Sequence, residues 1–204
     1  MMTLPKFDNP NITTEELLAE QDRLHQQADK MLVTTGLATI FSRYGELLPI
    51  GGSYAYELMV YPDLDMNVIA DEVTTQDFAR MVAEIAASDF VRGFSAADRV
   101  RFAPSHPGRP KGYWIGLDIP FEDDRWGVDL WLQAREWENG NNDSYREKLA
   151  HISQEQAAAI LAIKYHLIHN GSYGKQFFST DIYDAVLDHG VLSFDDFVNK
   201  STAS

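Results

Sequence analysis

The sequence predicts an α+β fold, in which helical segments at both ends of the chain flank a middle region of strands. A capping-box pattern begins a helix in each end segment. The middle of the chain alternates apolar and polar residues with the period of two that is typical of strands. We therefore expect an N-terminal helical segment (1–45), a core (46–138) and a C-terminal helical segment (143–204).

The N-terminal segment is predicted to be helical almost throughout. Thr13 and Glu16 stand three residues apart, as the two partners of a capping box do. The helical pattern then continues to about Tyr44, with a break near 34–36, and Gly45 ends it.

The core is predicted to contain several short strands and one helix. Leu64, Met66 and Val68 alternate with polar neighbours, which indicates a strand with one buried face. Apolar residues recur with helical spacing over 75–87. The other strands are expected at 47–50, 100–102, 113–120 and 126–133, and an acidic loop at 121–125 joins the last two.

The Asn-Gly-Asn-Asn run at 139–142 is the expected boundary between the core and the C-terminal segment. Beyond it, Ser153 and Gln156 form the second capping box, and the Asn-Gly pair at 170–171 ends the helix that they begin. Two further helices are expected, over 180–189 and from Ser193 onward.

The strongest functional pattern is Gly52-Ser53 followed ten residues later by Asp63-Leu64-Asp65. Residues two apart on a strand point to the same side, about 6–7 Å apart along it, so Asp63 and Asp65 can bind the same cations. A glycine lets the backbone approach phosphate groups, and a serine hydroxyl can donate to a phosphate oxygen. The pattern indicates a site for a nucleoside triphosphate and its metal ions.

A third aspartate, Asp129, stands in the strand expected at 126–133. Val128, Leu130 and Leu132 form the apolar face of that strand, so Asp129 lies on the opposite face, where an aspartate needs a partner or a metal. Asp118 also interrupts an apolar strand and is the reserve candidate for this third position.

Other structures and functions also use an Asp-x-Asp pair. A calcium loop is excluded, because Val68 stands where glycine is required and Thr74 stands where the bidentate glutamate should be. A phosphoaspartate hydrolase would need an apolar strand directly before Asp63, and Tyr61-Pro62 is a poor substitute. A solvated turn that carries two acids remains the alternative.

In the C-terminal segment, Lys164 lies in the middle of a helical apolar stripe. It either extends to the surface or reaches an anion in a cleft, and we favour the triphosphate. Asp184 could orient Lys164 or act as a base, or could simply belong to a solvated face with Asp181 and Asp188. The histidines are expected to serve packing or capping: His166, His169 and His189.

These patterns resemble the nucleotidyltransferase superfamily, which has the DNA polymerase β-like fold, over residues 48–133. The resemblance implies a nucleotidyltransferase-like mixed β-sheet with helices on one side, followed by a helical C-terminal part. It also implies that Asp63, Asp65 and Asp129 are the catalytic metal ligands and that Gly52 and Ser53 bind the triphosphate. Residues 46–138 would then be the catalytic core.

A narrower resemblance comes from Ile163-Lys164-Tyr165-His166-Leu167 and from Asp181-Ile182-Tyr183-Asp184. These runs are similar to later motifs of the abortive-infection toxin-type nucleotidyltransferases, although Thr180 stands where that family has a basic residue. The lincosamide and aminoglycoside nucleotidyltransferases share the same core. The resemblance thus implies a role in a toxin–antitoxin system or in antibiotic resistance.

Composition limits the compartment and the partners. The 204 residues include no cysteine, which excludes disulfides, thiolate zinc sites and cysteine nucleophiles. No signal peptide or membrane-spanning run is recognised, so we expect a cytoplasmic protein without a membrane partner. The net charge of −14 disfavours a large nucleic-acid footprint, although nucleic acid stays possible, and favours a small cationic acceptor.

One basic segment opposes this acidic balance. Its cationic residues are Arg99, Arg101, His106, Arg109 and Lys111. The segment is either a solvated loop or a contact for triphosphate or an anionic acceptor.

The sequence therefore predicts an Mg²⁺-dependent nucleotidyltransferase, with two ions expected and Mn²⁺ as an alternative. It would transfer a nucleoside monophosphate from a triphosphate, with ATP as the expected donor, to a hydroxyl on a small molecule, a protein or an RNA end. The alternative is a non-catalytic nucleotide-binding or interaction module of the same fold.

Overall fold

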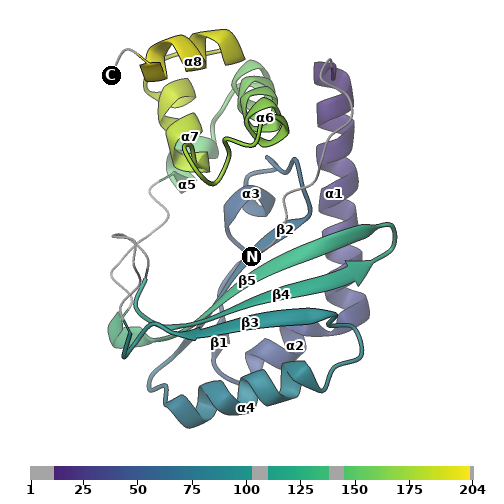
Figure 1. Cartoon of the computed structure of the whole chain (residues 1–204), viewed down its shortest axis with the longest axis vertical. Coiled ribbons are helices and arrows are strands. Elements are labelled where there is room, and N and C mark those ends of the chain that lie inside the picture. The colour runs from purple at the N-terminus through teal and green to yellow at the C-terminus, as the bar shows by residue number, and fades with distance from the viewer. Residues whose placement is uncertain (1–11, 103–109, 138–144, 203–204) are drawn as a thin grey trace. The chain divides into compact units, whose positions relative to one another are not determined.

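The computed structural model describes residues 12–102, 110–137 and 145–202 (Figure 1). The chain forms two compact units. The sheet unit comprises Gln26–Ala55 and Pro62–Asn141, and the helical unit comprises Met1–His25, Tyr56–Tyr61 and Asn142–Ser204. The predicted boundary at 139–142 lies outside the described residues, and the three-segment division stays a prediction.

The sheet unit contains a five-stranded sheet in the order β1-β2-β5-β4-β3 (Figure 1). The pairing of β2 with β5 is parallel, whereas the other three pairs are antiparallel, so the sheet is mixed. The strands are β1 (Glu46–Leu47), β2 (Asp63–Ala70), β3 (Gly93–Asp98), β4 (Tyr113–Phe121) and β5 (Asp124–Ala134).

Helices pack against one face of this sheet. The Phe78 ring of α4 (Thr75–Ala86) stacks on Tyr113 of β4, with 4.6 Å between ring centroids. From α1 (Thr14–Thr35), Gln27 accepts a hydrogen bond of 3.2 Å from the indole of Trp126 in β5. The buried strand residues on this face alternate as expected: Leu64, Met66, Val68, Ile115, Leu117, Ile119, Val128, Leu130 and Leu132. The opposite face carries the alternate residues of the same strands, among them the aspartates of β2 and β5.

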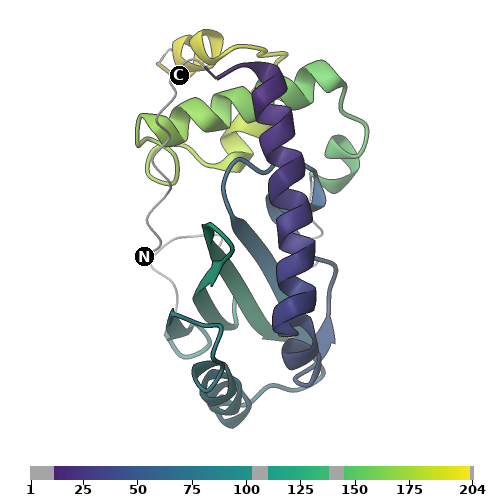
Figure 2. The ribbon, with the colours of Figure 1, turned by 90° about the vertical axis from the view of Figure 1, so that its right-hand side faces the viewer.

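The predicted N-terminal helix is confirmed, including its capping box and its break. The N–H of Glu16 donates to the Thr13 hydroxyl at 3.2 Å, and the N–H of Thr13 donates to the Glu16 carboxylate at 2.8 Å. Gly36 then adopts a φ of 62° between α1 and the short α2 (Leu37–Ser42). Figure 2 shows α1 as one continuous helix.

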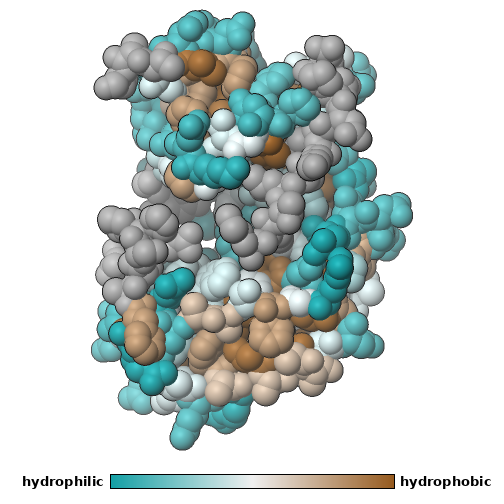
Figure 3. Space-filling model, viewed as in Figure 1, coloured by the Kyte–Doolittle hydropathy of each residue, from teal (hydrophilic) through white to brown (hydrophobic). Residues whose placement is uncertain are grey.

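Two predicted strands differ from the structure. Of the strand expected at 47–50, only Leu47 lies in a strand, β1. The strand expected at 100–102 is wrong, because these residues form a turn or bend, and the edge strand beside β4 is β3, at Gly93–Asp98. The Asp98 carboxylate ends β3, because it accepts the N–H groups of Val100 at 3.0 Å and Arg101 at 2.9 Å. β3 escaped detection because an edge strand of small residues has little apolar periodicity. Figure 3 shows apolar surface over β3 and α4, where Phe94 is 44% exposed.

The helical unit is built around α6 (Gln154–His169), whose buried residues form much of its core. Its predicted capping box is confirmed. The N–H of Gln156 donates to the Ser153 hydroxyl at 3.1 Å, and the N–H of Ser153 donates to the side-chain oxygen of Gln156 at 2.9 Å. This unit also contains α5 (Arg146–Leu149), α7 (Ser179–Leu187) and α8 (Phe194–Thr202). Within the described ranges no helix is long and apolar enough to cross a membrane.

Candidate active site

The parallel pairing of β2 with β5 brings two of the predicted aspartates together. Asp65 and Asp129 are register partners, and neighbouring strands lie about 4.7–4.9 Å apart. Asp63 stands two residues before Asp65 on the same face, opposite Gly127. Asp65 is exposed, and Asp63 and Asp129 are half-buried. The apolar neighbours of these residues turn to the helix-covered face, which leaves the carboxylates on the other face.

The Gly-Ser turn lies directly against Asp65. The N–H of Gly51 donates to the Asp65 carbonyl oxygen at 3.0 Å. Gly52 has a φ of 62°, and a Cβ at this position would overlap the Asp65 carboxylate, with only 3.0 Å to its Cγ. Gly52 and Ser53 begin the short helix α3 (Gly52–Ala55). A glycine is therefore required where the turn meets the carboxylate.

A second close approach lies on the other side of Asp129. Gly116 of β4 is the register partner of Asp129, and a Cβ at Gly116 would lie 3.4 Å from Asp129 Oδ1. The same Cβ would lie 2.6 Å from Cζ2 of Trp114, so the indole of Trp114 covers Gly116. Across the sheet the order is therefore the Gly52 turn, Asp65, Asp129 and the Trp114 ring.

The arrangement of the carboxylates limits the kind of metal site that they can form. Among the residues that the structure describes, no three His, Cys, Asp or Glu side chains are gathered closely enough to hold one. Mg²⁺, however, is usually bound by one or two carboxylates together with substrate phosphate oxygens. The paired Asp65 and Asp129 beside the Gly52 turn fit that mode of binding. Binding of metal by all three aspartates stays a prediction.

Lys164 lies in the core of the helical unit. Its side chain is 0% exposed, and its Nζ donates to the carbonyl oxygen of Leu58 at 3.2 Å. The ammonium also lies 5.5 Å from the ring centroid of Tyr61 and 5.7 Å from that of Tyr173, within the range of cation–π attraction. Lys164 therefore does not extend to the surface, and its contact with triphosphate stays a prediction.

These contacts predict that the fold loses stability when the Lys164 side chain is removed. Lys164→Ala is expected to lower the free energy of unfolding by about 2–4 kcal/mol, because it opens a cavity and leaves the Leu58 carbonyl without this donor. Urea unfolding measures the change. The matched control is Lys148→Ala, since Lys148 is exposed and pairs with Asp188 at 2.8 Å, and its expected cost is below about 1 kcal/mol. Equal losses in the two variants would contradict a structural role for Lys164.

The reserve candidate Asp118 already has a cationic partner. Its carboxylate accepts hydrogen bonds from Arg125, one of them 3.2 Å from Nε, and this pairing raises the pKa of Arg125. Asp184 of the helical unit accepts a hydrogen bond of 2.8 Å from the Tyr145 hydroxyl. Burial, followed by this hydrogen bond, raises the pKa of Tyr145. Both aspartates thus make contacts that suit a structural role.

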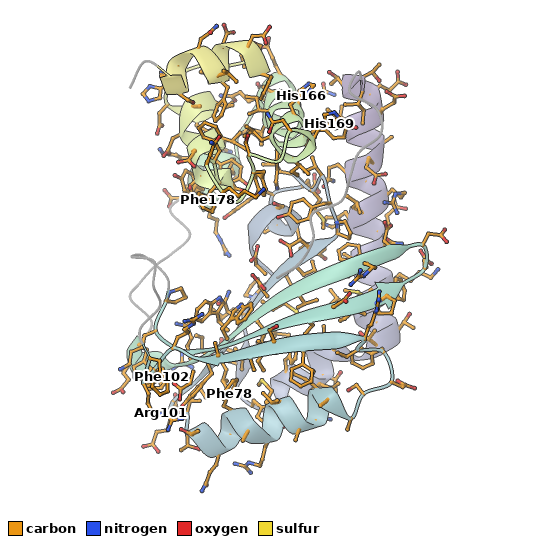
Figure 4. All side chains as sticks on the ribbon, viewed as in Figure 1. Phe78, Arg101, Phe102, His166, His169 and Phe178 are labelled. Atoms are coloured by element: carbon orange, nitrogen blue, oxygen red, sulfur yellow. The ribbon has the colours of Figure 1, made fainter. Side chains whose placement is uncertain are left out.

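His166 and His169 lie on α6 in the helical unit (Figure 4). The His166 ring packs 5.0 Å from that of Phe194, between centroids. Burial, with a smaller contribution from the nearby His169, lowers the pKa of His166, which Asp195 partly opposes. The contact with Phe194 is consistent with the predicted packing role of His166.

The basic segment is described only at its two ends, since His106 and Arg109 lie outside the described residues. Arg101 pairs with Asp98 at 2.5 Å and lies 5.7 Å from the Phe102 ring centroid (Figure 4). Lys111 lies 4.7 Å from the Trp137 ring centroid. Both interpretations of the segment stay open.

Comparisons with known proteins find similarity in structure. No family model matches the chain, and no curated protein matches it. A structure of the poly(A) polymerase complex GLD-2–GLD-3 aligns over 90% of this chain and 61% of that chain, with a TM-score of 0.54 and 13% identity. The fold is nucleotidyltransferase-like. Cid1 poly(U) polymerase with MgGTP bound aligns over 74% of this chain and 46% of that chain, with a TM-score of 0.46 and 18% identity.

The comparison confirms the predicted α+β fold class, with its mixed sheet and flanking helices. The chain spans 61% of the length of the poly(A) polymerase chain that it matches. The narrower resemblance to toxin-type or antibiotic nucleotidyltransferases gains no support from these structures. Sequence reasoning missed the aromatic group beside the site: Trp114 gave no signal, because its closeness to Asp129 depends on strand pairing.

Proposed function

We propose that the chain is an Mg²⁺-dependent nucleotidyltransferase, which moves a nucleoside monophosphate from a nucleoside triphosphate to a hydroxyl acceptor. The observation that carries the proposal is the register pairing of Asp65 with Asp129, together with the close packing of Gly52 on the Asp65 carboxylate. This arrangement places carboxylates for a hard cation next to a turn at which backbone can approach phosphates.

Each residue has a defined part in this proposal. Asp63, Asp65 and Asp129 would hold magnesium. Gly52 allows the triphosphate to approach the backbone, and the Ser53 hydroxyl donates to a phosphate oxygen. Bound magnesium supplies neutralisation of the leaving pyrophosphate and activation of the acceptor hydroxyl. The protein contributes mainly by positioning the donor and the acceptor for in-line attack at the α-phosphorus.

The donor and the acceptor are proposed on different grounds. ATP remains the expected donor. The similar structure is that of a poly(A) polymerase, which favours an RNA end over a small molecule or a protein as acceptor. The net charge of −14 limits that contact to a few nucleotides, because a large acidic surface repels a phosphate backbone.

Thermal unfolding with each of the four nucleoside triphosphates tests the donor site. Ligand at a hundred times its dissociation constant adds about 2.7 kcal/mol, which for a chain of this size raises the midpoint by roughly 5–10 °C. We expect one nucleotide to produce this shift with Mg²⁺, and Asp63→Asn to abolish it. The absence of a shift with all four nucleotides would contradict the proposed site.

The second candidate is a non-catalytic module that binds nucleotide without transferring it. It would use the same Gly52 turn and the same carboxylates to bind the nucleotide and its metal ion. Pyrophosphate release separates the two functions. A magnesium-dependent thermal shift without pyrophosphate release, at any acceptor tested, would support the binding module.

A further inference from the structure

Two tryptophans lie beside the carboxylates on the same face of the sheet. Trp114 of β4 and Trp131 of β5 are register partners, two positions along from the pair Gly116 and Asp129. Residues two apart on a strand share a face, so both indoles are on the side that carries Asp129. Both are half-buried rather than enclosed in the core. The helices pack on the opposite face of the sheet, so their packing does not explain why two tryptophans stand here.

The Trp114 ring can lie next to Asp129 because Gly116, between them, has no side chain. Gly116 lies between them, and any Cβ there would lie 2.6 Å from Cζ2 and 2.9 Å from Cη2 of the indole. The ring can lie along the strand over Gly116 only because that residue is a glycine. Trp131 is the register partner of Trp114 on the next strand, and its Cε3 would lie 3.5 Å from a Cβ at Gly112.

The two sides of the carboxylate pair differ in chemistry. The Gly52 turn touches Asp65 on the β2 side, and the Trp114 ring adjoins Asp129 on the β4 side. In nucleotidyl transfer the attacking hydroxyl and the leaving pyrophosphate lie on opposite sides of the phosphorus. With the triphosphate at Gly52, the Trp114 side is therefore the side from which the acceptor approaches.

A cationic residue directly follows the strand that pairs with the Trp114 strand. The N–H of Arg99 donates to the Gly112 carbonyl at 3.0 Å, which continues the β3–β4 ladder by one position beyond Asp98. Arg99 is the first residue of the turn that follows β3, two positions after Ala97, which is the register partner of Trp114. Aromatic rings combined with a cation bind single-stranded nucleic acid, whereas Arg99 would repel a polycationic small molecule.

We propose that Trp114 and Trp131 form a stacking surface for the bases at the 3′ end of a single-stranded RNA acceptor, and that Arg99 contacts its phosphodiester backbone. This inference rests on the proposed nucleotidyl transfer, because that reaction identifies the acceptor side. The stacking surface would hold the terminal ribose beside Asp129, which is where the attacking hydroxyl is needed.

The test is direct binding of a 5′-labelled RNA hexamer to the full chain, measured by fluorescence anisotropy. Trp114→Ala is expected to weaken binding about tenfold or more, the effect of losing one stacked base, and Trp114→Phe to restore most of the affinity. Phe94→Ala is the matched control, because Phe94 is an exposed aromatic residue on the opposite face of the same sheet. An unchanged affinity in Trp114→Ala would overturn the proposal.

A hexamer with an abasic 3′-terminal position tests the same contact in the unaltered protein, even if Trp114→Ala does not fold. It should bind several-fold more weakly than the intact hexamer, and equal affinity would overturn the proposed stacking of the terminal base. Arg99→Gln should reduce the slope of log K against log salt by about one, whereas Arg101→Gln should not, since Arg101 is paired with Asp98. An equal slope for Arg99→Gln and the unaltered chain would overturn the role of Arg99.

None of these measurements needs a nucleoside triphosphate or turnover. Failure of the proposed transfer reaction therefore leaves a clear binding result, and failure of RNA binding leaves the thermal-shift test of the donor site unaffected.

Discussion

Replacing Asp65 by asparagine is expected to reduce nucleotidyl transfer at least about a thousandfold. The substitution removes a charge that holds magnesium, and magnesium contributes several kcal/mol to stabilising the transition state, with tenfold in rate for every 1.36 kcal/mol. The fold should persist, because Asp65 is exposed and asparagine has nearly the same shape. Pyrophosphate release in the presence of Mg²⁺, nucleotide and RNA is the measurement. Asp63→Asn and Asp129→Asn are expected to cause similar losses.

Two further aspartates make this experiment selective. Asp71→Asn is the control, because Asp71 lies just beyond the end of β2 and pairs with Arg135 at 3.1 Å. Asp118→Asn tests the reserve candidate, which pairs with Arg125. Both variants are expected to retain activity. Near-normal turnover in Asp65→Asn, or loss of turnover in Asp118→Asn with Asp129→Asn active, would contradict the assignment.

Gly52→Ala is expected to lower turnover about a hundredfold while every carboxylate stays in the sequence. The new Cβ would occupy the position of the Asp65 carboxylate, which must then move away from Asp129. A displacement of about 1 Å at a reacting centre is enough to cost a hundredfold in rate. The φ of 62° adds backbone strain of roughly 1 kcal/mol, which lowers stability as well.

Substitutions at two other glycines separate the collision with Asp65 from the backbone strain. Gly36 has the same φ of 62°, but a Cβ there would meet no atom within 4 Å, so Gly36→Ala reproduces the backbone strain alone. At Gly51 the Cβ would lie 3.9 Å from the Asp65 carbonyl oxygen, which is ordinary contact, so Gly51→Ala tests the turn without the collision. Both controls should retain turnover. Equal activity of Gly52→Ala and Gly36→Ala would show that the contact with Asp65 has no catalytic importance.

The helices and the polar face of the sheet could be predicted because their signals are local. The capping residues Thr13 and Ser153 bond to the backbone only three residues away, and both predicted helix starts are present. The alternation around Asp65 likewise depends on neighbours along one strand. β3 could not be predicted in the same way, because Gly93–Asp98 is an edge strand whose pairing with β4 is its main signal.

The environment of Lys164 could not be predicted from its local sequence. Its position in an apolar stripe allowed either the surface or a cleft, and the choice depends on groups that are distant in the sequence. The carbonyl of Leu58 and the rings of Tyr61 and Tyr173 surround its ammonium in the folded helical unit. A buried lysine needs such partners, and only packing can supply them.

The sequence by itself determined that Asp63, Asp65 and Asp129 occupy polar faces of strands, because side-chain direction follows from the backbone period of two. The tertiary structure alone decided that Asp65 pairs with Asp129, that Gly52 packs on Asp65, and that the Trp114 ring lies beside Asp129. Strand order and register depend on burying the apolar faces of all strands together, which is a property of the whole sheet and not of any one segment.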